Sequence, residues 1–142
     1  MASRLFVDTW GWLTLRDKRE VRHQEVTAFY RQRRLASDEV VTTDYVLDET
    51  FTLIYKRLPR VQAQDSMRIL LQAIESGYTR LEWITPDRFA RTLRLKEQLQ
   101  DKPNISFTDL SSMVVMEEFS ISMILTGDAH FTHVGKGFQL AP

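Results

Sequence analysis

Cysteine is missing from all 142 residues of the chain. Disulfide bonds, a thiolate nucleophile and a zinc site built on cysteine are therefore excluded. The absence suits a reducing compartment, so we expect a cytoplasmic protein. Long apolar runs are missing too, since none approaches the about 20 residues that a membrane-spanning helix needs. The apolar run at residues 5–7 is too short for the core of a signal peptide, so neither a membrane span nor a signal peptide is expected.

An excess of charge is also missing, because 19 basic residues balance 19 acidic ones. The overall charge therefore neither favours nor excludes a nucleic-acid partner. Two stretches are locally basic, residues 16–22 and 31–34, and we interpret each first as a solvated helix face. The hydrophobic share of 43% is enough for a packed core, and the length fits a single domain over residues 1–142.

Short apolar runs alternate with segments of helical periodicity along the chain. Strands are predicted at residues 4–7, 39–42, 81–84, 121–125 and 138–140. Helices are predicted at residues 20–34, 44–58, 61–76, 86–99 and 109–119. Val21, Phe89 and Leu93 are expected to point inward from their helices. This alternation predicts an α/β protein, a three-layer α/β/α sandwich with a mainly parallel central sheet.

Acidic residues stand at places where such a fold presents side chains. Asp8 follows the first strand, and Asp128 follows the strand at residues 121–125 after a short Thr-Gly turn. Open α/β sheets bind their ligands at the carboxyl ends of the strands. Asp109 lies in the first turn of a helix, with Thr108 as its expected N-cap. These three carboxylates are therefore expected at one edge of the sheet.

A fourth acid, Glu49, lies inside the predicted helix 44–58. Its neighbours three and four residues away are Tyr45, Val46 and Leu53, so we place it in the apolar stripe that faces the sheet. The adjacent Asp48 is expected on the solvent side. An acid in an apolar stripe is costly unless its charge is compensated, and a bound cation would compensate it.

Four carboxylates at one edge of a sheet would repel one another when ionised. Mg²⁺ or Mn²⁺ resolves that repulsion, because hard divalent cations prefer carboxylate and water oxygens. Such an ion lowers the pKa of a bound water and holds phosphate oxygens. His130 is interpreted as a turn residue rather than a general base. A site made of oxygens alone favours phosphoryl chemistry over zinc hydrolysis.

Four pieces of sequence carry a resemblance to a known family. They are Phe6-Val7-Asp8-Thr9, Leu47-Asp48-Glu49-Thr50, Phe107-Thr108-Asp109 and Leu125-Thr126-Gly127-Asp128-Ala129-His130-Phe131. In order and spacing, over almost the whole chain, they resemble PIN-domain proteins and most of all the VapC-type toxin ribonucleases of toxin–antitoxin systems. One departure is Leu110, which stands where the family often has alanine.

The resemblance implies a PIN-like fold and a Mg²⁺- or Mn²⁺-dependent endoribonuclease. The family's four catalytic and metal-binding acids match Asp8, Glu49, Asp109 and Asp128. It also implies an RNA substrate, an antitoxin protein that fills the acidic groove, and a homodimer. The threonines beside the acids are interpreted as caps or as supports for the metal ligands: Thr9, Thr108 and Thr126. The partner contacts are expected around Trp10, Trp12 and Tyr55.

Other functions compete with a toxin. A haloacid-dehalogenase-type phosphatase needs a second aspartate two residues after the first, where this chain has Trp10. A phospho-receiver domain needs a pair of acids before its first strand-end aspartate, which residues 4–7 do not supply. Two alternatives stay open: an RNA-processing nuclease of PIN type that works without an antitoxin, and a catalytically silent PIN-like module that only binds RNA or other partners.

Overall fold

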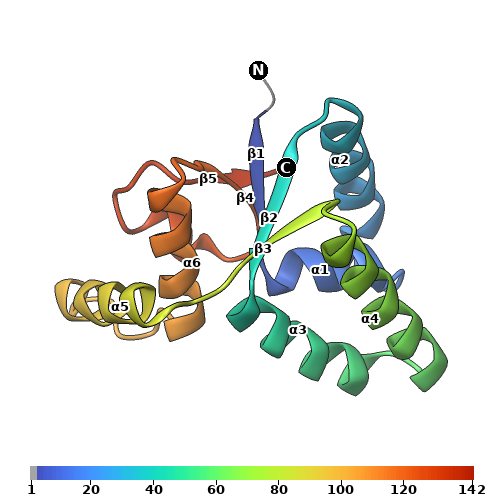
Figure 1. The fold of residues 1–142 in the computed structure, drawn as a ribbon, viewed down its shortest axis with the longest axis horizontal. Helices are drawn as coiled ribbons and strands as arrows, with labels where there is room; N and C mark the ends of the chain where they lie inside the picture. Colours follow the sequence, from blue (N-terminus) through green and yellow to red (C-terminus); the bar gives the residue numbers. More distant parts are fainter. Residues whose placement is uncertain (1–2) are drawn as a thin grey trace.

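A computed structural model describes residues 3–142, with a five-stranded sheet between two groups of helices (Figure 1). The strands are β1 (Arg4–Val7), β2 (Glu39–Thr43), β3 (Thr79–Glu82), β4 (Met123–Leu125) and β5 (Gln139–Ala141). The helices are α1 (Thr9–Arg16), α2 (His23–Leu35), α3 (Asp44–Arg57), α4 (Arg60–Glu75), α5 (Pro86–Gln98), α6 (Phe107–Glu118) and the 3-10 helix η1 (Ala129–Thr132). The predicted α/β class is confirmed.

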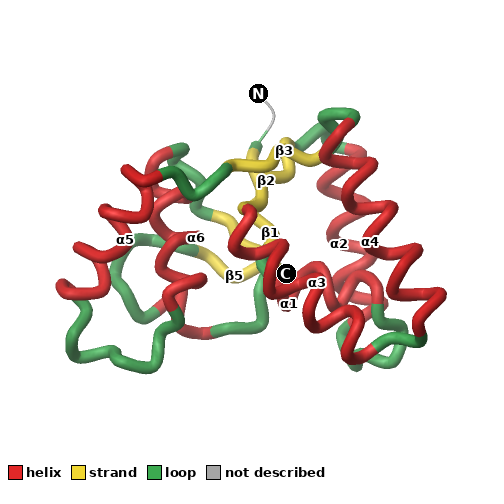
Figure 2. Tube along the Cα trace, turned by 60° about the horizontal axis from the view of Figure 1, so that its bottom comes forward, coloured by secondary structure: helices red, strands yellow, loops and turns green. Residues whose placement is uncertain are grey.

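The sheet is parallel throughout, with the strand order β3-β2-β1-β4-β5. Helices α1 to α4 lie on one side of it and α5 and α6 on the other, as both Figure 1 and Figure 2 show. The chain runs outward from β1 to β3 and then returns through α5 and α6 to β4, on the other flank of β1. The order of strands thus reverses between β1 and β4. Such a switch point opens a crevice at the carboxyl ends of the two strands.

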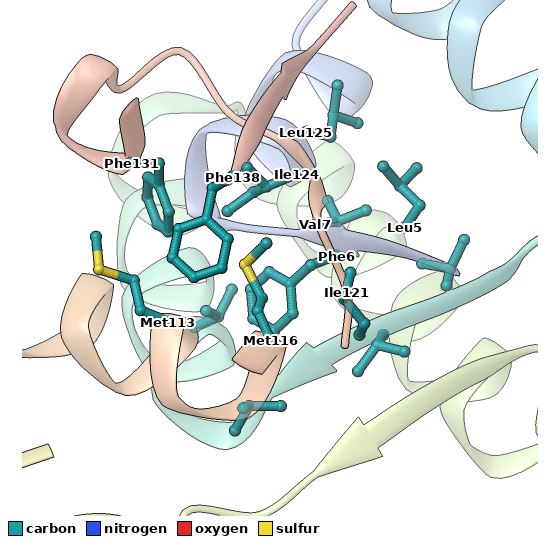
Figure 3. Close-up of a cluster of buried hydrophobic side chains, with 14 of the residues drawn as sticks. Leu5, Phe6, Val7, Met113, Met116, Ile121, Ile124, Leu125, Phe131 and Phe138 are labelled. Carbon is teal, nitrogen blue, oxygen red and sulfur yellow. The ribbon is translucent and has the colours of Figure 1, made fainter. Parts of the chain in front are cut away.

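The core fixes the strands that lead into this crevice. Residues 5–7 of β1 are completely buried, as expected for a parallel strand that is covered on both faces. Met113 and Met116 of α6 lie in the same buried cluster as Phe6, Phe131 and Phe138 (Figure 3). The backbone position of Asp8, which directly follows β1, is therefore fixed by the core.

Hydroxyl caps define where the helices begin. Thr43 caps α3, and Thr85 caps α5 with Pro86 at the first helical position. The prediction for α6 is wrong by two residues: Ser106, not Thr108, is the cap, and its Oγ accepts a hydrogen bond of 3.0 Å from the backbone N–H of Asp109.

Three inward-pointing residues were predicted wrongly. Val21 is 99% exposed, because the chain forms turns before α2 begins at His23. Phe89 and Leu93 of α5 are exposed as well. The buried face of that helix carries Arg88 in place of an apolar side chain, and ion pairs with acids on β3 and α6 make its burial possible.

Two further segments differ from their predicted form. Strand β3 begins two residues earlier than predicted, because Thr79 to Glu82 pair in register with β2. Residues 9–16, for which neither a helix nor a strand was predicted, form the helix α1. Within residues 3–142, none of the helices combines the length and the apolar character needed to span a membrane.

Candidate functional site

A groove of about 490 Å³ opens at the carboxyl end of the sheet, where the strand order reverses. All four predicted acids line it: Asp8, Glu49, Asp109 and Asp128. They come from four separate parts of the chain, namely the end of β1, the helix α3, the first turn of α6 and the turn after β4. The fold therefore brings together carboxylates that lie up to 120 positions apart in the sequence.

Asp8 is the most deeply buried of these acids and is 5% exposed. It caps α1, because its Oδ1 accepts a hydrogen bond of 3.0 Å from the N–H of Gly11. Its Oδ2 accepts a second hydrogen bond from the hydroxyl of Thr126. That contact follows from the sheet register, in which Val7 pairs with Leu125 and the next residues of the two strands become neighbours.

The turn after β4 presents Asp128. The hydroxyl oxygen of Thr126 accepts a hydrogen bond of 3.1 Å from the N–H of Asp128, and Asp128 Oδ1 accepts one of 2.9 Å from the N–H of His130. Gly127 packs closely against Trp10. A Cβ added at position 127 would stand 2.6 Å from an atom of the indole. A side chain at position 127 would therefore push the indole or the turn out of place.

A histidine belongs to this cluster of acids. One ligand atom each from Asp109, Asp128 and His130 lies within 4.8 Å of the others. His130 Nδ1 is 3.1 Å from Asp128 Oδ1. From the sequence, His130 was interpreted as a turn residue and the site was expected to contain oxygen ligands alone, so the contact between His130 and Asp128 was not predicted. The short helix η1 causes it, since it folds His130 back towards the acid that caps it.

Glu49 lies at the rim of the groove. It is exposed, so the prediction that it belongs to a buried stripe is wrong. The buried face of α3 consists of Val46, Leu47, Thr50 and Ile54. Asp48 is also exposed but does not line the groove. Of these two neighbouring acids, only Glu49 faces the other carboxylates.

Burial and mutual repulsion make the ionised form costly for two of the acids. Burial raises the pKa of Asp8 to about 7, even though the hydrogen bonds from Thr126 and Gly11 act in the opposite direction. Burial is also the largest cause that raises the pKa of Asp109 well above its ordinary value. The hydrogen bond with Asp128 and the negative charge of Asp128 raise it further. The charge of Glu49 adds to both shifts. A positive ion in the groove would remove this cost.

The three predicted supporting threonines differ in their surroundings. Thr126 is buried and contacts Asp8 directly. Thr9 lines the groove and is 6% exposed, and its hydroxyl has no hydrogen-bond partner within the described residues. Thr108 does not line the groove, and its carbonyl oxygen accepts hydrogen bonds from two serine hydroxyls in the next turn.

The aromatic residues expected to contact a partner are mostly covered. Trp12 is 5% exposed and donates its indole N–H to Thr42 Oγ1 at 3.2 Å, so its predicted role as a surface contact is wrong. Trp10 packs against Gly127, and the guanidinium of Arg22 lies 5.2 Å from the centre of its ring. Tyr55 is exposed.

Sequence reasoning did not single out several other residues of the groove. Arg57, Asn104 and Ser106 line it together with the acids. A detectable signal existed for Arg57, which follows Glu49 by eight residues in the same helix and therefore falls on the same face. No such signal existed for Asn104, because a loop has no periodicity.

Comparisons with known proteins agree with this geometry. The PIN domain matches residues 5–137. The crystal structure of VapC20 from Mycobacterium tuberculosis, described as a sarcin-ricin loop cleaving toxin, has a TM-score of 0.76 and 27% identity, over 92% of this chain and 95% of that one. PAE2754 from Pyrobaculum aerophilum shares the fold, with a TM-score of 0.63 and 18% identity over 99% of this chain and 90% of that one.

Curated protein sequences give no match. The residues that match the PIN domain begin in β1 and end just before β5, and they include every acid of the groove. The chain belongs to the PIN domain family.

Proposed function

We propose that the protein is a metal-dependent endoribonuclease that hydrolyses RNA phosphodiester bonds. The observation that carries this proposal is the groove in which Asp8, Glu49, Asp109 and Asp128 meet. PIN domains are typically metal-dependent nucleases, and the chain belongs to that family. Its structural similarity to VapC20, a toxin that cleaves the sarcin-ricin loop, supports RNA as the substrate.

The residues present fit a divalent cation. Asp8, Asp109 and Asp128 offer carboxylate oxygens, which Mg²⁺ and Mn²⁺ both accept. His130 adds an imidazole nitrogen beside two of these acids, a donor that suits Mn²⁺ better than Mg²⁺. Within residues 3–142 the buried hydroxyl of Thr9 has no hydrogen-bond partner, and an ion or its water would supply one.

The roles of the chain's own residues follow from their positions. A divalent cation bound here supplies Lewis-acid stabilisation of the negative charge on phosphate oxygens. Asp8 is held in place by two hydrogen bonds, and Asp109 by the first turn of α6. Glu49, unlike the buried Asp8, is exposed to water at the rim of the groove. We assign it the task of orienting a water molecule and accepting its proton.

We further propose that residues 1–142 act as one PIN-like domain and as the toxin of a toxin–antitoxin pair. The similarity to VapC20 supports this role. An antitoxin segment would then occupy the acidic groove. Pairing of two copies is proposed as well, since Trp83, Phe89 and Leu93 leave apolar surface exposed near and on α5.

The test is cleavage of a single-stranded RNA by the purified protein. With Mn²⁺ we expect cleavage that EDTA stops and renewed Mn²⁺ restores. Asp109→Asn is expected to reduce the rate by at least about 100-fold, because it removes a charged metal ligand. Asp48→Asn is the matched control and should retain the wild-type rate, since Asp48 lies outside the groove. Cleavage that continues in EDTA, or an Asp109→Asn variant as active as the wild type, would contradict the proposal.

A further inference from the structure

The groove extends beyond the acids along one face of α3. Glu49, Leu53 and Arg57 all line it, at spacings of four residues. Residues four apart lie above one another on a helix, and eight residues rise about 12 Å. Arg57 therefore stands about two helical turns away from the acidic end of the groove.

Between these two ends the wall is apolar. Leu13 of α1 and Leu53 of α3 line this part of the groove, and both belong to one small hydrophobic cluster. Apolar side chains give no binding energy to a phosphate group. They do suit the bases of a nucleic acid, whose flat faces are apolar. The groove thus offers carboxylates, an apolar stretch and a guanidinium, in that order.

The backbone of Arg57 is fixed while its side chain stays available. Its carbonyl oxygen accepts a hydrogen bond of 2.7 Å from the guanidinium of Arg19. Within residues 3–142, the guanidinium of Arg57 makes no hydrogen bond or ion pair. Basic neighbours are already engaged: Arg19 pairs with Asp17, and Arg16 donates to Ser66.

Arg57 stands apart from the acids, about two helical turns along α3 from Glu49. Its distance along the helix exceeds the Debye length of about 8 Å at physiological salt. The positive charge does lower the pKa of Asp17, which is already hydrogen-bonded to Arg19. The guanidinium of Arg57 can therefore bind an anion that enters the groove.

We propose that Arg57 binds a backbone phosphate of the RNA some nucleotides away from the bond that is cut. This inference rests on the proposed ribonuclease function. A strand that keeps its bases stacked advances about 3.4 Å per nucleotide, so the rise along α3 corresponds to about three to four nucleotides. Because Arg57 lies at one end of the groove only, it fixes the direction of the RNA and the shortest substrate that binds fully.

The test compares Arg57→Gln with Lys56→Gln. Both residues are exposed in the last turn of α3 and both substitutions remove one positive charge, but only Arg57 lines the groove. With Mn²⁺ and a fluorescent single-stranded RNA of about ten nucleotides, Arg57→Gln should raise KM about tenfold and leave kcat nearly unchanged. The slope of log affinity against log salt should fall by about 0.7 in magnitude. Lys56→Gln should match the wild type in both measurements.

Truncated RNAs locate the contact. Shortening the RNA on one side of the cut should raise the wild-type KM to that of Arg57→Gln, while shortening it on the other side should not. Arg57→Lys, which keeps the charge, should recover part of the loss and serves if the glutamine variant is unstable. Equal behaviour of the glutamine variants at positions 56 and 57 would overturn the inference.

Failure of the proposed function looks different. If the wild type cleaves RNA and Arg57→Gln has an unchanged KM, the inference is wrong and the ribonuclease proposal stands. If the wild type binds RNA without cleaving it, fluorescence anisotropy on the same variants still tests Arg57, and an unchanged affinity would overturn its role. If the wild type neither binds nor cleaves RNA, both proposals are wrong.

Discussion

Replacing Asp8 with asparagine is expected to abolish RNA cleavage and, at the same time, to stabilise the metal-free protein at pH 8. Asparagine keeps the shape of a protonated aspartic acid and can still accept from the N–H of Gly11. It removes the buried negative charge that repels Asp128 and Glu49. Cleavage should fall by at least about 100-fold, because a carboxylate ligand is lost.

The gain in stability depends on pH in a defined direction. The pKa of Asp8 rises from its ordinary value of 3.8 to about 7 on folding, so the folded protein binds more protons than the unfolded chain between these values. The free energy of unfolding therefore falls as pH increases from about 4 to about 7 and stays low above that. The full effect corresponds to at most about 4 kcal/mol. The advantage of Asp8→Asn should be greatest at pH 8 and vanish near pH 4.

Urea denaturation of both proteins in EDTA, at several pH values between 4.5 and 8, measures this difference. Saturating Mn²⁺ should reverse the order at pH 8, because the ion stabilises the wild type and not the variant. A variant that is less stable than the wild type at pH 8 in EDTA would show that the burial of Asp8 costs nothing.

Replacing Arg88 with methionine is expected to destabilise the protein by about 3–5 kcal/mol. Arg88 is 9% exposed, and its guanidinium contacts both carboxylate oxygens of Glu118, one oxygen of Glu82 at 3.0 Å and the carbonyl of Trp83 at 2.7 Å. These contacts connect β3, α5 and α6. Methionine would leave Glu82 and Glu118 with one arginine partner each, Arg80 and Arg91, and would remove the contact that joins the two acids. We expect this to cost more than a lost surface ion pair.

Arg91→Met is the matched control, because Arg91 also pairs with Glu118 but is 33% exposed. Its loss should cost less than about 1 kcal/mol. The arginines lower the pKa of Glu118 to about 2, so its contribution to stability is complete above about pH 4.5 and is lost as pH falls towards 2. Thermal unfolding at pH 7 and pH 3 tests both points. Similar losses for the two variants at pH 7 would contradict the assigned role of Arg88.

Strand-end acids were the part of the site that sequence could predict. Asp8 and Asp128 follow short apolar runs, and parallel strands bring their carboxyl ends to one edge regardless of the details of packing. The N-terminal position of Asp109 depends only on helix periodicity and a cap, and it survives the error that assigned the cap to Thr108 instead of Ser106.

The remaining features depend on contacts that no local pattern contains. The position of His130 is set by the single turn of η1, and the exposure of Glu49 is set by how far α3 rotates over its buried face. Phe89 and Leu93 were predicted to be buried because the spacing of apolar residues along a helix carries no information about ion pairs with distant segments. Arg88 occupies the inner face because it forms ion pairs there with Glu82 of β3 and Glu118 of α6.

Anomalous diffraction from crystals grown with Mn²⁺ is the most direct test of the central claim, that acids from separate segments meet in one groove and that Asp8, Asp109 and Asp128 hold a cation there. We predict a manganese peak in the groove, bound by Asp8, Asp109 and Asp128, that disappears in the Asp8→Asn variant. A groove without manganese at saturating concentration, or a peak bound by other residues, would contradict the account.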